Sequence, residues 1–138
     1  MIKTKRLYCI GDVGTLPEFE NIPVHQIVGL VNTSIDHIHI DNINKYTKND
    51  AIKIIQISLE KLRPKGLLSI QIYNYSHICK LYSDNAITDD KLISYISGNQ
   101  CIFSIPMIIS LLDSAGAKVS ELNFSADQFT IDLVSEKK

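Results

Sequence analysis

The chain has no long hydrophobic run and no excess of charge of one sign, and these absences exclude two classes of protein. Although 45% of its 138 residues are hydrophobic, no stretch approaches the roughly 20 apolar residues that cross a bilayer. Fourteen Lys and Arg residues face fifteen Asp and Glu residues, for a net charge of −1. Because nucleic-acid affinity depends largely on neutralising phosphates, we expect neither a membrane protein nor a dedicated nucleic-acid-binding protein.

Cysteine is scarce, and its spacing argues against a disulfide framework or a structural zinc site. Cys9, Cys79 and Cys101 are widely separated and form no C-x-x-C pair. Free thiols fit a reducing compartment, and the N-terminal residues lead into a strand rather than a signal peptide. We therefore expect a cytoplasmic protein. The length fits one domain, residues 1–138.

Nucleophile elbows of the G-x-S-x-G type are also absent, so covalent hydrolysis has no support. His37 and His39 lie two residues apart on one face of a predicted strand, with Asp41 next in register, and this spacing could supply three metal ligands. Such ligands diverge too little to surround an ion without a group from elsewhere. We therefore favour a structural role for the two histidines and predict no metal.

What the chain does contain is a succession of strand and helix patterns in α/β order. Apolar, β-branched runs predict strands over residues 5–10, 20–24, 26–31, 35–40, 67–73, 119–125 and 128–135, the last two forming an antiparallel hairpin. Apolar residues at helical spacing predict helices over 47–63, 76–83, 89–96 and 104–115. Ser104 is the expected N-cap of the last helix and Gly116 its left-handed C-cap. The strand–helix–strand order over 35–73 implies parallel pairing, with strand 35–40 between strands 5–10 and 67–73.

Two positions at the ends of predicted strands are candidates for ligand binding. The backbone N–H groups of Gly11, Asp12 and Gly14 could cradle a cofactor, but paired glycines also occur in ordinary strand-ending turns. Asp41 and Asn42 end the predicted central strand, where open α/β sheets bind ligands. Polar residues also end strands for turn chemistry alone, so both interpretations stay open at each position.

Several short segments follow one another in the order found in a known family. They are residues 7–14, 16–22, 34–40, 62–66, 79–82, 96–100 and 111–116. In this order the chain resembles small class I S-adenosylmethionine-dependent methyltransferases of the type found in surface-polysaccharide gene clusters. The resemblance implies an α/β, Rossmann-like methyltransferase fold, with a mostly parallel sheet, helices on its faces and a C-terminal antiparallel hairpin.

The resemblance also implies S-adenosylmethionine as the cofactor. The residues that would hold it are Gly11, Asp12, Gly14, Asp41 and Asn42. In the family, an acidic residue at the end of the second strand holds the ribose hydroxyls, whereas residues 21–24 here contain no carboxylate. The segment before strand 35–40 is also shorter than in the family. The predicted fold is therefore pared down in its N-terminal half, with a degenerate cofactor site.

By resemblance, the expected activity is methyl transfer to a small or sugar-like acceptor, achieved mainly by holding donor and acceptor in line. No catalytic residue is assigned. The alternative is a non-catalytic binding or assembly module that keeps the methyltransferase fold. Because so short and isoleucine-rich a chain can leave apolar faces uncovered, we also expect a homo-oligomer.

Overall fold

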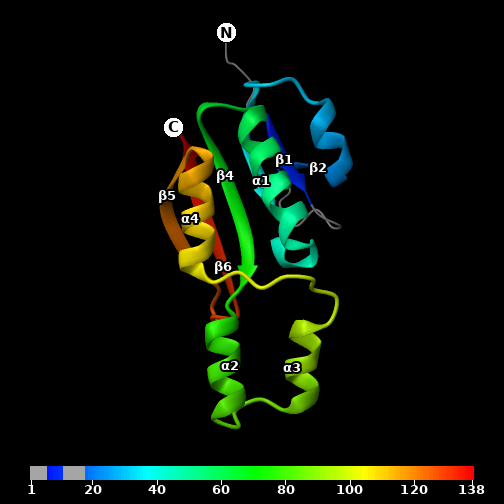
Figure 1. The fold of residues 1–138 in the computed structure, drawn as a ribbon, viewed down its shortest axis with the longest axis vertical. Coiled ribbons are helices and arrows are strands. Elements are labelled where there is room, and N and C mark those ends of the chain that lie inside the picture. The colour runs from blue at the N-terminus through cyan, green and yellow to red at the C-terminus, as the bar shows by residue number, and fades with distance from the viewer. Residues whose placement is uncertain (1–5, 11–17) are drawn as a thin grey trace.

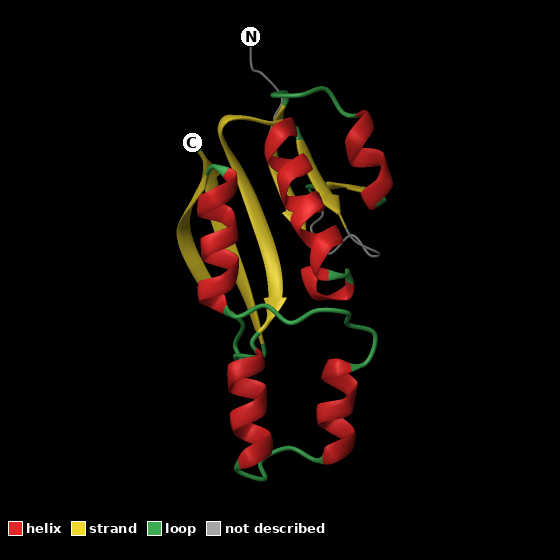
Figure 2. Ribbon diagram, viewed as in Figure 1, coloured by secondary structure: helices red, strands yellow, loops and turns green. Residues whose placement is uncertain are grey.

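A computed structural model describes residues 6–10 and 18–138, which form a six-stranded sheet with helices packed on it (Figures 1 and 2). The strands are β1 (Leu7–Ile10), β2 (Glu20–Ile22), β3 (Ile35–Ile40), β4 (Leu62–Tyr73), β5 (Ala117–Phe124) and β6 (Thr130–Lys137). The helices are α1 (Lys48–Lys61), α2 (Tyr75–Ser83), α3 (Asp89–Ile96) and α4 (Ile105–Ala115), and two 3-10 turns are η1 (Val24–Gly29) and η2 (Ile43–Lys45).

The strand order is β2-β1-β3-β4-β6-β5. Strands β2, β1, β3 and β4 are parallel, whereas β6 runs antiparallel to both β4 and β5. The predicted parallel sheet with a terminal antiparallel hairpin is therefore confirmed, as is the predicted position of β3 between β1 and β4. Parallel pairing matters for function because it brings the carboxyl ends of four strands to the same end of the sheet.

Helices α1 and α4 lie side by side on one face of the sheet, whereas α2 and α3 extend beyond the end of β4 (Figure 1). The buried cluster under α1 and α4 combines Ile38 and Ile40 of β3 with Ile70 of β4, Ile55 of α1 and Leu112 of α4. Burying side chains of this size contributes roughly 1.5–3 kcal/mol each. Among the described residues, no helix is long and apolar enough to cross a membrane.

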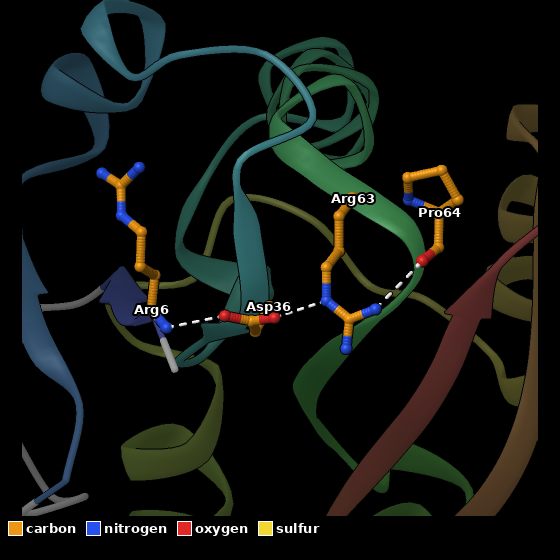
Figure 3. Close-up of polar contacts among 4 residues, drawn as sticks. All are labelled: Arg6, Asp36, Arg63 and Pro64. Atoms are coloured by element: carbon orange, nitrogen blue, oxygen red, sulfur yellow. Dashed lines mark hydrogen bonds and ion pairs between the residues drawn. The ribbon is translucent and has the colours of Figure 1, made fainter. Parts of the chain in front are cut away.

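At the amino ends of the parallel strands, polar contacts of Asp36 connect neighbouring strands (Figure 3). The backbone N–H of Arg6 donates to Asp36 Oδ2 at 2.7 Å, and Arg63 Nε pairs with Asp36 Oδ1. Arg63 also donates to the carbonyl of Pro64 at 3.3 Å. Because the Arg63 side chain is 48% exposed, this ion pair contributes at most about 1 kcal/mol. Its main effect is to align β1, β3 and β4 at their amino ends.

Helix ends follow the predicted caps. Thr47 Oγ1 accepts a hydrogen bond from the backbone N–H of Asp50 at 3.2 Å, and Ser104 Oγ accepts one from Met107 at 3.3 Å. Gly116 has the predicted left-handed conformation, with φ of 97°. These side chains and this glycine satisfy backbone groups that a helix cannot pair internally, which explains why the start of α1 and both ends of α4 could be predicted. Helix α1 ends at Lys61, two residues before the predicted end, because Leu62 and Arg63 belong to β4.

One predicted strand is wrong, and the bounds of several others differ from the structure, most of all those of β4. Residues 24–29 form the 3-10 turn η1, so the strand predicted over 26–31 is wrong. In this turn only Ile27 is buried, which shows that its apolar residues do not follow the alternation of a strand. Strand β4 also begins at Leu62 rather than at residue 67, because Leu62 already pairs with Ile35; the register then shifts, and Leu67 pairs with His37.

Replacing Gly116 with alanine is expected to destabilise the protein by about 1–2 kcal/mol, because an L-residue is strained in the left-handed conformation. No atom lies within 4 Å of the position that a Cβ would take, so the loss would come from backbone strain alone. Urea unfolding followed by circular dichroism measures it. Gly29→Ala is the matched control, since its Cβ also has open space and Gly29 has no positive φ; a loss of equal size there would contradict this explanation.

Candidate functional site at the carboxyl ends of the parallel strands

The predicted residues Asp41 and Asn42 follow β3 at the edge where the parallel strands end. The backbone N–H of Asp41 donates to the carbonyl of Ile10 at 2.9 Å. Asp41 therefore lies beside the last residue of β1, next to the point where the predicted glycine loop begins. Gly11, Asp12 and Gly14 themselves lie outside the described residues.

Asn42 has a left-handed backbone, with φ of 47° and ψ of 73°, a conformation that asparagine tolerates better than most residues. Its side-chain Nδ2 donates to Asn99 Oδ1 at 3.2 Å. Its Oδ1 is buried and accepts no hydrogen bond from any described residue. Leaving a buried acceptor unpaired costs about 1–3 kcal/mol, so this oxygen is a position where a ligand's donor would be favourable.

Asn44 connects the end of β3 to the end of β4. It is fully buried, and its side-chain Oδ1 accepts a hydrogen bond from the backbone N–H of Tyr73 at 2.9 Å. Its Nδ2 donates to the carbonyl of Cys101 at 3.2 Å, and its own carbonyl accepts from the N–H groups of Gln100 and Cys101. This single side chain therefore holds η2, β4 and the segment before α4 together.

A series of hydrogen bonds extends from Asn42 toward α2 and α3. Asn99 Nδ2 donates to the hydroxyl of Tyr75 at 3.0 Å and to the carbonyl of Tyr95 at 2.8 Å. Burial raises the pKa of the Tyr75 hydroxyl, so this group stays protonated and donates to the carbonyl of Tyr95 at 3.2 Å. The ring of Tyr73 lies 5.8 Å from that of Tyr75. Two tyrosine rings thus lie beside this series of hydrogen bonds.

Sequence reasoning missed Asn44, Asn99 and Tyr75. Asn99 lies in the segment 96–100 that carries part of the family resemblance, which is the one signal that pointed to it. Asn44 lies two residues after Asn42, but nothing in its neighbourhood indicates burial. Tyr75 lies next to the start of the predicted helix 76–83, and nothing in the local sequence indicates a hydrogen-bonding role for it.

A pocket of about 510 Å³ opens beside Tyr75. It is lined by the end of β4, the first turns of α2 and α4, and the segment that leads into α4. Ile72, Phe103 and Ile131 are buried residues among its lining. Tyr75 therefore belongs both to the lining of this pocket and to the series of hydrogen bonds that reaches Asn42.

His37 and His39 form a different cluster, on the alternate face of β3 from Ile38 and Ile40. Ser69 Oγ lies 2.9 Å from His37 Nε2 and 2.7 Å from His39 Nδ1. Burial lowers the pKa of His37 to about 4 and lowers that of His39 as well, so both rings are neutral at pH 7. No cluster of three or more His, Cys, Asp or Glu residues in the described ranges could hold a metal ion. The two histidines, spaced two residues apart, therefore both hydrogen-bond the hydroxyl of Ser69.

The end of β2 presents no carboxylate at the site edge. Ile22 is the last residue of β2 and is buried, and Pro23 follows it. Glu20 lies two residues back, opposite Tyr8, which places it roughly 7 Å before the strand end. Its side chain is exposed and shares the face of Ile22, so it does not extend past the carboxyl end of the strand.

No protein-family model and no curated protein matches the chain, but its fold is similar to those of solved structures. Magnesium protoporphyrin IX methyltransferase from Synechocystis PCC 6803, with bound S-adenosylhomocysteine, aligns at a TM-score of 0.60 and 10% identity, over 87% of this chain and 51% of that protein. A SAM-dependent methyltransferase from Archaeoglobus fulgidus aligns at 0.62 and 11%, over 86% and 68%. A possible histamine N-methyltransferase from Thermotoga maritima aligns at 0.61 and 16%, over 87% and 64%.

The chain spans about half of the Synechocystis enzyme and about two thirds of the other two. At these identities the similarity concerns the fold. The aligned structures share the Rossmann-like architecture predicted from the sequence, with its mostly parallel sheet and its antiparallel C-terminal pair. The chain therefore has the fold of class I S-adenosylmethionine-dependent methyltransferases.

Proposed function

We propose that the protein is an S-adenosylmethionine-dependent methyltransferase-like protein that binds its cofactor at the carboxyl edge of the sheet with weakened affinity. The observation that carries the proposal is the position of Asp41 and Asn42, which end β3 beside the end of β1 in a methyltransferase fold. Open α/β sheets bind ligands at this edge. The three methyltransferases described above supply the cofactor class.

The residues at this edge fit parts of the cofactor. The buried, unpaired Oδ1 of Asn42 suits an amino or hydroxyl donor, and Gly11, Asp12 and Gly14 would supply the backbone N–H groups. When bound, S-adenosylmethionine supplies a methyl group on a positively charged sulfur. Asp41 would complement that charge and would accept the proton that an acceptor hydroxyl loses as its oxygen gains the methyl group.

The affinity is expected to be low because β2 offers no partner for the ribose. A carboxylate there would make charge-assisted hydrogen bonds worth roughly 1.5–3 kcal/mol, which corresponds to about one to two decades in the dissociation constant. This same feature favours the second candidate function, a non-catalytic binding or assembly module that keeps the fold and does not use the cofactor.

Titration calorimetry with S-adenosylmethionine and S-adenosylhomocysteine tests the proposal. We expect a dissociation constant of about 100 µM, weakened at least 3-fold by Asp41→Asn and by Asn42→Gly, which keeps the left-handed backbone accessible. Asp113→Asn is the matched control, because Asp113 is exposed on α4. Absence of heat at millimolar ligand would contradict the proposal and favour the non-catalytic module, whereas micromolar or tighter binding would contradict the weakened site.

A further inference from the structure

We infer that the pocket beside Tyr75 is the acceptor site and that it takes a molecule with an uncharged, apolar, ring-sized body, such as a phenol. The role as acceptor site rests on the methyltransferase function proposed above. The chemical class of the ligand rests on the pocket alone. A sugar-like acceptor, which the family resemblance implies, is the competing outcome.

The described walls of the pocket are mostly apolar and carry no charged side chain. Ile72, Phe103 and Ile131 contribute to its lining and are at most 2% exposed. Ile102 also lines it but is 61% exposed, so a large apolar side chain is left in water beside an apolar space. Among the described residues that line it, none is Asp, Glu, Lys, Arg or His. A charged ligand would find no side-chain counter-ion there.

The side chains of Asn74, Tyr75 and Ser104, which line the pocket, already make hydrogen bonds within the fold, whereas the hydroxyls of Tyr73 and Ser76 bond no described residue. Asn74 Oδ1 accepts from the backbone N–H of His77 at 3.4 Å, and Asn74 Nδ2 donates to the carbonyl of Gln128 at 3.0 Å. Ser104 Oγ accepts from Met107 as the N-cap of α4. A sugar buried here would carry more hydroxyls than the two side chains of Tyr73 and Ser76 can pair, and each hydroxyl left unpaired would cost about 1–3 kcal/mol. An apolar body avoids this cost.

Size and connection both fit an acceptor. A volume of about 510 Å³ lies within the range of small-molecule sites, roughly 300–1,000 Å³. Tyr75 lines the pocket, and its hydroxyl is hydrogen-bonded to Asn99, which in turn holds Asn42. The ring that borders the ligand is therefore linked by two side-chain hydrogen bonds to the edge where the cofactor is proposed to bind.

Cys79 provides a probe of occupancy without any substitution. It lines the pocket and is exposed, whereas Cys9 is buried and burial raises the pKa of both Cys9 and Cys101. N-ethylmaleimide should therefore modify Cys79 first, and mass spectrometry of peptides would show it. We expect saturating p-cresol to slow this reaction at least 3-fold and methyl α-D-glucopyranoside at the same concentration to leave it unchanged. Equal protection by the glucoside, or none by p-cresol, would overturn the inference.

A pair of variants locates the binding. Cys79→Trp places bulk at the pocket, and Lys80→Trp places the same bulk at the next position of α2, which does not line it. In saturation-transfer NMR we expect p-cresol to bind Lys80→Trp as it binds the unaltered protein and to bind Cys79→Trp at least 10-fold more weakly. Equal binding to both variants would overturn the assignment. If Cys79→Trp fails to fold, the alkylation experiment on the unaltered chain still decides.

Measuring p-cresol with and without S-adenosylmethionine separates the two proposals. Cofactor binding without p-cresol binding would overturn this inference and leave the proposed function in place. Binding of p-cresol without binding of the cofactor would support the ligand class of the pocket and overturn its role as an acceptor site, together with the proposed function.

Discussion

Replacing Asn44 with leucine is expected to destabilise the protein by about 2–4 kcal/mol, because two backbone groups would lose the hydrogen bonds that they make to its buried side chain. The N–H of Tyr73 and the carbonyl of Cys101 both bond to this side chain. Asn44 is fully buried, so water cannot easily replace the lost hydrogen bonds. Leucine has a similar size, and the expected loss therefore comes from unpaired polar groups rather than from a cavity.

Urea unfolding followed by circular dichroism measures this loss. Asn123→Leu is the matched control, because Asn123 is exposed on β5 and, within the described part of the chain, its side chain hydrogen-bonds only Glu121; a change within about 0.5 kcal/mol is expected there. Asn44→Asp adds a second comparison, since it keeps an acceptor for Tyr73 but removes the donor to Cys101. A loss below about 1 kcal/mol for Asn44→Leu would show that Asn44 does not hold the site together.

The position of the candidate site could be predicted from local sequence because strand ends and helix caps leave local signals. The polar end of strand 35–40 at Asp41 marks the carboxyl ends of the strands, and the strand–helix–strand pattern over residues 35–73 implied a parallel crossover. The caps Thr47 and Ser104 bond N–H groups three residues away. Such contacts depend on a few neighbouring residues, so spacing alone was sufficient to find them.

The interior of the site could not be predicted, because its contacts join residues far apart in the sequence. Asn42 bonds Asn99 across 57 positions, and Asn99 bonds Tyr75 across 24. His37 and His39 were recognised as a pair, but Ser69, which lies 30 and 32 positions away, was not. The packing of strands and helices decides which buried polar residues contact one another. The apolar pattern predicts those elements, but it does not indicate which polar residues pair.

Acidification is expected to destabilise the protein between pH 6.5 and pH 4 through the His37–Ser69–His39 cluster. Burial lowers the pKa of His37 from 6.5 to about 4, so in this range the unfolded chain binds a proton that the folded chain does not. As far as His37 determines it, the free energy of unfolding is therefore highest above pH 6.5, decreases as the pH falls, and levels off near pH 4. Allowing for the partial exposure of His37 to solvent, we expect a loss of about 1–2 kcal/mol from this residue.

The neighbouring groups modify this profile in opposite directions. Burial also lowers the pKa of His39, although Asp132 and Asp41 act against that shift, so His39 adds to the loss. Burial raises the pKa of Asp132; protonation at low pH removes the cost of its buried charge and offsets part of the loss. Thermal unfolding from pH 7 to pH 4 should show a smaller decline for His37→Gln, which removes one titrating ring and keeps a hydrogen-bonding amide near Ser69. His25→Gln, at an exposed position, controls for removal of a histidine, and an unchanged decline in His37→Gln would show that this cluster does not set the acid sensitivity.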